Sequence, residues 1–86
     1  MPSVEEVKVH VAASVDQTER AVAAMRAVTD QLDEALARLR LTAIGSVHPS
    51  VFDAISRLEQ ARMRLEEAQT LALGATDAAN SYRAIV

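Results

Sequence analysis

A single break interrupts the helical pattern of this chain near its midpoint, at Ile44-Gly45-Ser46-Val47-His48-Pro49. Alanine-rich segments with the periodicity of an α-helix extend on both sides of it. Two long helices joined by one short break fold back on each other as an antiparallel hairpin. We therefore predict an all-α fold, a coiled-coil-like two-helix hairpin that forms a single domain over residues 1–86. Its helices are expected at about 4–42 and 49–85, with the turn at about 43–48.

Both predicted helices carry start signals. Ser3 is followed three residues later by Glu6, the spacing of a capping box in which the serine hydroxyl accepts a hydrogen bond from a free backbone N–H. Pro49 fits the first turn of the second helix, where its missing N–H loses no hydrogen bond. Gly74 is a poor helix former inside the second segment, and it marks either a bend or a close crossing of the two helices.

Residues of the first helix recur every seven positions in three adjacent, mainly apolar rows, which together form a broad face. The first row is Val4, Val11, Thr18, Met25, Leu32 and Leu39, the second is Val7, Ser14, Ala21, Val28 and Ala35, and a flank adds Val15, Val22 and Leu36. We expect the first two rows to form the core of the hairpin.

The second helix shows two matching rows. They are Val51, Leu58, Leu65, Ala72, Ala79 and Val86, and Ala54, Ala61, Ala68, Ala75 and Tyr82. A dense core sets large side chains against small ones. The register that does so pairs Leu32 with Ala61 and Met25 with Ala68.

Further apolar residues lie outside these four rows, and two helices alone do not cover them. We expect them to form a second apolar strip that serves as an interface. The candidates are Val15, Val22, Leu36, Phe52, Ile55, Leu71, Leu73 and Ile85. A second hairpin over this strip completes a four-helix bundle, so we expect either a homodimer or a helical hetero-partner.

Composition argues against several classes of function. The net charge of −3 and the lack of a basic cluster disfavour nucleic-acid binding. No cysteine is present, which excludes disulfides and thiolate metal sites. The first residues lack the pattern of a secretory signal peptide, and no apolar run is long enough to span a bilayer. We expect a cytoplasmic protein, with export without a cleavable signal peptide as the alternative.

No set of residues indicates a catalytic, metal, cofactor or small-molecule site. His48 adjoins Pro49, where we expect it to cap the second helix through its ring or backbone rather than to bind a metal. Glu66 and Glu67 are adjacent carboxylates that point in different directions on a helix, and a narrow hairpin offers little pocket for general acid–base chemistry. We therefore predict a non-enzymatic protein–protein interaction module.

In length and plan the whole chain resembles the early-secreted-antigen-like WxG family of type VII secretion, whose members are short helical hairpins that pair into four-helix bundles. The turn reads Ile44-Gly45-Ser46 where that family has its tryptophan, and Val86 follows Tyr82 at the spacing where its export signal has an acid. The Ser-Val-Glu-Glu start, the Gly-Ser-x-His-Pro turn and the late tyrosine also look like a group of short actinobacterial helical-hairpin proteins. The resemblance implies an alternative function, a type VII secretion-associated substrate, adaptor or chaperone.

Overall fold

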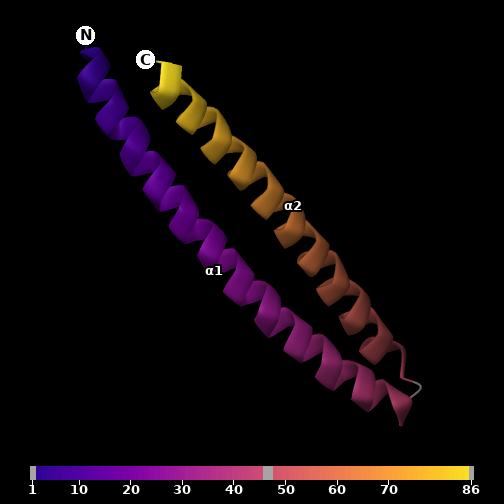
Figure 1. Ribbon diagram of the computed structural model, residues 1–86. Coiled ribbons are helices and arrows are strands. Elements are labelled where there is room, and N and C mark those ends of the chain that lie inside the picture. Colours follow the sequence, from indigo (N-terminus) through magenta and orange to yellow (C-terminus); the bar gives the residue numbers. More distant parts are fainter. Residues whose placement is uncertain (1, 46–47, 86) are drawn as a thin grey trace.

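The protein is an antiparallel hairpin of two long α-helices in a computed structural model that describes residues 2–45 and 48–85. Helix α1 spans Val4–Ile44 and helix α2 spans Pro49–Ile85. The helices lie side by side along their whole length and curve gently together, with both ends of the chain at the same end of the hairpin (Figure 1). The Cα atoms extend over 63 × 20 × 15 Å. The predicted helical hairpin is therefore confirmed.

Capping interactions fix where the helices begin. The Glu6 N–H donates to Ser3 Oγ at 3.2 Å, and the Val7 N–H donates to the Ser3 carbonyl at 3.0 Å. The first helix continues to Ile44, slightly beyond the predicted end near residue 42. Helix α2 begins at Pro49, as predicted.

His48 caps α2 through both its ring and its backbone, as the sequence suggested. The Ser50 N–H donates to His48 Nδ1 at 3.2 Å, and the Val51 N–H donates to the His48 carbonyl at 3.1 Å. These bonds satisfy two N–H groups that have no acceptor within the first turn of a helix. The part of the predicted turn at Ser46 and Val47 lies outside the described residues, as does Val86.

A seam with alternating steps of four and three residues joins the two helices, which is the spacing of a coiled coil. The α1 residues that are buried or half-buried at this spacing are Lys8, Val11, Val15, Thr18, Val22, Met25, Thr29, Leu32, Leu36, Leu39 and Ala43. Those of α2 are Val51, Ile55, Leu58, Arg62, Leu65, Gln69, Ala72, Thr76 and Ala79. The first predicted row of each helix, which contains Val11 in α1 and Val51 in α2, is therefore in the seam. The second predicted row of each helix is not in the seam, and the rows that contain Val15 and Ile55 take its place.

Polar side chains interrupt the α2 half of the seam. Gln69 Nε2 donates to Thr29 Oγ1 at 3.2 Å, and the Thr29 hydroxyl donates in turn to the Met25 carbonyl at 3.0 Å. Thr76 is 7 % exposed, and its Oγ1 has no hydrogen-bond partner within the described part of the chain. The α2 half of the seam thus combines one apolar row with one mostly polar row. The apolar row is Val51, Leu58, Leu65, Ala72 and Ala79, and the polar row is Ile55, Arg62, Gln69 and Thr76.

The predicted pairing of large with small side chains in the core is wrong. Ala61, which was expected to face Leu32 in the core, is exposed. Because the second row of α2 in the seam is Ile55, Arg62, Gln69 and Thr76 rather than the alanines, the pairing of large with small residues does not determine the alignment.

Gly74 does not mark a close crossing of the helices. A Cβ atom added there would have no neighbouring heavy atom within 4 Å. Both Gly74 and the end-of-helix residue Gly45 have a negative φ, so neither backbone requires glycine.

Candidate interaction surface

The eight residues predicted to form a second apolar strip are separated by the fold. Val15, Val22 and Leu36 are buried between the helices, with exposed fractions of 7 %, 3 % and 1 %. Ile55 is half-buried in the same seam. The interface prediction for the three buried residues is wrong, because they cannot contact a partner while the hairpin is closed. Only the other four of the eight are exposed, namely Phe52, Leu71, Leu73 and Ile85.

Side-chain size explains why the flank row of α1 is buried in place of its second predicted row. Val22 and Leu36 each lie one position after a smaller residue of the second predicted row, Ala21 and Ala35. Burying the larger side chain of each pair removes more apolar area from water, at about 25 cal/mol per Å². A small rotation of α1 about its axis is enough to turn the larger residues inward. The smaller residues then lie beside the seam rather than within it.

The four exposed candidates do not form one strip either. Phe52 and Leu73 are in one seven-residue row of α2, and Leu71 and Ile85 are in another. Leu71 and Leu73 are two positions apart, so their side chains point about 200° apart around the helix. A single partner helix cannot cover both rows. The hairpin therefore has two opposite broad faces, and the direction in which each row points decides to which face it belongs.

One broad face of the hairpin is charged, and ion pairs cross it between the helices. Arg40 Nη2 lies 2.9 Å from Glu59 Oε1, and Arg62 Nε donates to Asp33 Oδ1. Arg62 Nη1 also contacts Glu66 Oε1 at 2.7 Å. The hydrogen bond and the charge of Asp33 raise the pKa of the Arg62 guanidinium, with a further contribution from Glu66. The rows on this face are Glu19, Arg26, Asp33 and Arg40 of α1, and Phe52, Glu59, Glu66, Leu73 and Asn80 of α2.

The opposite broad face, which we call the uncharged face, carries no ionisable acid or base other than one tyrosine. It is formed by the rows that lie on the other side of the seam. These rows are Val7, Ser14, Ala21, Val28, Ala35 and Thr42 of α1, and Ala54, Ala61, Ala68, Ala75 and Tyr82 of α2. They are largely the rows that were predicted to form the core. Ala21, Ala61 and Ala75 are exposed, and Val28 is 42 % exposed.

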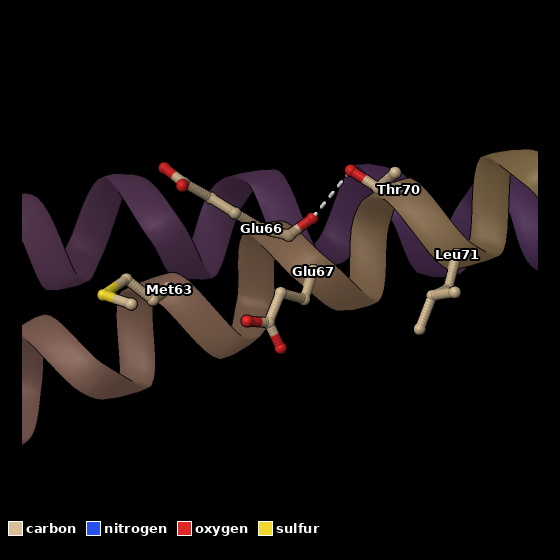
Figure 2. A pocket seen from close by; sticks show the side chains of 5 residues that line it. All are labelled: Met63, Glu66, Glu67, Thr70 and Leu71. Carbon is tan, nitrogen blue, oxygen red and sulfur yellow. Dashed lines mark hydrogen bonds between the residues drawn. The ribbon is translucent and has the colours of Figure 1, made fainter.

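Leu71 extends the apolar surface along the border of the uncharged face. It is 75 % exposed and lies next to Ala68 and Ala75 on α2, at the spacings that bring helix side chains together. Figure 2 shows Leu71 projecting away from the side of α2 on which Glu66 lies. Between them, Met63, Glu67 and Thr70 line a shallow hollow on the outer surface of α2.

Several charged residues outside these faces form ion pairs along one helix. Arg57 Nε contacts Asp53 Oδ2 at 2.9 Å, and Arg20 Nη2 contacts Asp16 Oδ2 at 2.9 Å. In residues 2–45 and 48–85, no three His, Asp or Glu side chains come together in an arrangement that would hold a metal ion. Neither described helix has a segment apolar and long enough to cross a membrane.

The chain matches no known protein-family model, no curated protein and no solved structure. The resemblance to WxG proteins therefore remains a prediction. The role of the hairpin's surfaces follows from the chemistry of the residues that form them. The uncharged face was not among the interface residues predicted from the sequence. The signal that identifies it is the absence of Asp, Glu, Lys and Arg from one row of each helix, at seven-residue spacing.

Proposed function

We propose that this protein is a non-enzymatic interaction module, a helical hairpin that functions by packing against further helices. The observation that carries the proposal is the amount of surface that the hairpin leaves exposed. It exposes 6318 Å² at a mass of 9.3 kDa. Compact monomeric proteins of that mass expose about 5,000 Å². The hairpin therefore exposes roughly 1,300 Å² more than a compact protein of its size.

The extended shape explains this excess, because two helices side by side have no third layer to cover their broad faces (Figure 1). Large apolar side chains are among the exposed groups. Leu41 is 70 % exposed, Leu71 75 % and Met63 57 %. Isolated exposed residues of this kind are common, but a whole face without charge is typical of a surface that another helix covers.

Size-exclusion chromatography with light scattering tests this proposal directly. We expect a mass of at least twice 9.3 kDa at tens of micromolar, decreasing toward the monomer mass on dilution. The helical content should be the same across the concentration range if folded hairpins associate. A mass of 9.3 kDa at every concentration would contradict assembly through self-association.

A type VII secretion-associated substrate, adaptor or chaperone is the second candidate function. Its support is the plan of the chain, two helices of similar length, 41 and 37 residues, joined at a central turn. Appearance of the protein in culture medium, dependent on the secretion ATPase, is the expected result. Strict retention in the cytoplasm would exclude the substrate version of this function.

A further inference from the structure

We infer that the uncharged face is the contact surface for a second copy of this chain, and that the two copies pack face to face as a four-helix bundle. This inference rests on the proposed function and adds to it the partner and the face. Helices of such bundles carry two seam rows and one adjoining apolar row. Both helices of the hairpin have this pattern, and their adjoining rows lie on the same side of the seam.

The distribution of charge selects this face over the others. Outside the seam, every other row of the described helices contains at least one Asp, Glu, Lys or Arg, and the two rows of the uncharged face contain none. On the opposite face, Arg40 and Glu59 already neutralise each other between α1 and α2. Covering that pair would remove water from both ions, a cost that often exceeds the attraction between them.

The absence of charge also indicates why the partner is an identical chain. A twofold contact places the same surface on both sides of an interface, so charged residues near its axis face their own copies. On the uncharged face no such repulsion arises. The contact would be self-complementary without any matching of positive with negative groups.

The area available agrees with a stable dimer. Covering the excess of about 1,300 Å² on each copy would bury roughly 2,600 Å² in total, within the range of permanent homodimers. The broad face, at 63 by 20 Å between Cα extremes, presents on the order of 1,200 Å² to a partner. One face of the hairpin is therefore large enough to supply the whole interface.

The side chains of the face determine how closely two copies approach. Ala21, Ala61 and Ala75 are short and exposed, so the axes of opposing helices can approach to about 8 Å. Val28 and Leu71 project further and provide larger apolar contacts near the middle of the hairpin. Tyr82 is half-buried near the open end of the hairpin, at the edge of the same surface.

A pair of charge-introducing variants tests the face. In the double variant Ala21→Glu and Ala61→Glu, four new carboxylates enter the interface of the proposed dimer. We expect the dissociation constant of the dimer to rise at least about a hundredfold, which corresponds to about 2.7 kcal/mol. The control variant Ala27→Glu and Ala37→Glu makes the same chemical changes at exposed positions on the outer surface of α1. Its dissociation constant should stay close to that of the wild type in sedimentation equilibrium.

A second matched pair avoids any change to residues beside the seam. Leu71→Lys alters the border of the uncharged face, and Leu41→Lys alters the outer surface of α1, at similar exposed fractions of 75 % and 70 %. We expect the first to weaken the dimer at least about tenfold, or 1.4 kcal/mol, and the second to leave it unchanged. Circular dichroism confirms that each variant is still helical.

The outcomes separate this inference from the proposed function. A wild-type dimer that is unaffected by Leu71→Lys and by the Ala21→Glu and Ala61→Glu double variant would overturn the assignment of the face and leave self-association intact. Equal weakening by the variants on both surfaces would also overturn it. A wild-type monomer would refute both the inference and self-association.

Discussion

Gln69 on α2 donates a hydrogen bond to Thr29 on α1 across the seam, with 3.2 Å between Nε2 and Oγ1. The Thr29 hydroxyl uses its own proton for the Met25 carbonyl, at 3.0 Å, and so it accepts and donates at the same time. Polar pairs inside helical interfaces fix the alignment of the helices, because a shifted alignment leaves the partners unsatisfied. We attribute the observed register of the hairpin in part to this pair.

A double-mutant cycle measures the contribution of the pair. Thr29→Val and Gln69→Leu each remove one partner while keeping a similar volume. We expect their effects on the free energy of unfolding to be non-additive by about 1 kcal/mol, the usual net value of such a hydrogen bond. Urea unfolding at one fixed protein concentration provides the measurement, since self-association would otherwise alter the apparent stability. Additive effects would show that the bond does not contribute.

Thr76 is the clearest site for a stabilising substitution. Its hydroxyl is buried and lacks a hydrogen-bond partner in the part of the chain that the structure describes. Thr76→Val keeps the shape and removes the cost of the unsatisfied group, so we expect a gain of about 1 kcal/mol in the free energy of unfolding. Thr70→Val is the matched control, because Thr70 is exposed and its hydroxyl donates to the Glu66 carbonyl at 3.1 Å. A loss of stability in Thr76→Val would contradict this description of the core.

Gly74→Ala should also stabilise the hairpin. The backbone there is helical with a negative φ, and an added Cβ meets open space. Alanine is favoured over glycine in a helix by about 1 kcal/mol. Thermal unfolding at fixed concentration measures the change, and the dissociation constant should not change because Gly74 is outside the uncharged face. Destabilisation by alanine would imply that α2 bends or makes a contact at this position.

Leu36 contributes more to the stability of the core than the sequence predicted. It is 1 % exposed, and truncation to alanine should lower the free energy of unfolding by about 3 kcal/mol. Leu41→Ala is the control, because Leu41 is 70 % exposed and its truncation should have an effect below about 0.5 kcal/mol. If the two variants lost equal stability, Leu36 would not be in the seam, and the original interface prediction for it would regain support.

The fold could be predicted from the sequence because its signals are local. The break from Gly45 to Pro49, the Ser3 cap and the position of His48 each determine a helix end through neighbouring residues. The choice of seam rows could not be predicted in the same way. Ala21 and Val22 differ by only 100° around α1, and which of them faces α2 depends on the packing of the entire interface.

The predicted pairing of large with small side chains failed for a related reason. Matching large with small side chains assumed that alanines of α2 fill the core, whereas the structure places Gln69 and Thr76 there. The sequence alone gives no reason to choose a polar residue over alanine at a buried position. The uncharged face was nevertheless visible in the sequence, as rows of α1 and α2 without Asp, Glu, Lys or Arg. These rows were assigned to the interior because apolar character was the only criterion applied.

The central claim is that the uncharged face is covered by a second copy, and a single spin label on that face tests it most directly. The chain has no cysteine, so Ala68→Cys provides a unique attachment site. Ala68 lies near the middle of α2, and labels on two copies therefore remain close whether the hairpins pack parallel or antiparallel.

We predict strong dipolar broadening of the electron paramagnetic resonance spectrum of labelled Ala68→Cys, removed by mixing with excess unlabelled protein. A label at Ala27→Cys, on the outer surface of α1, should show much weaker broadening. A dimer without broadening at Ala68→Cys, or with stronger broadening at Ala27→Cys, would contradict the claim.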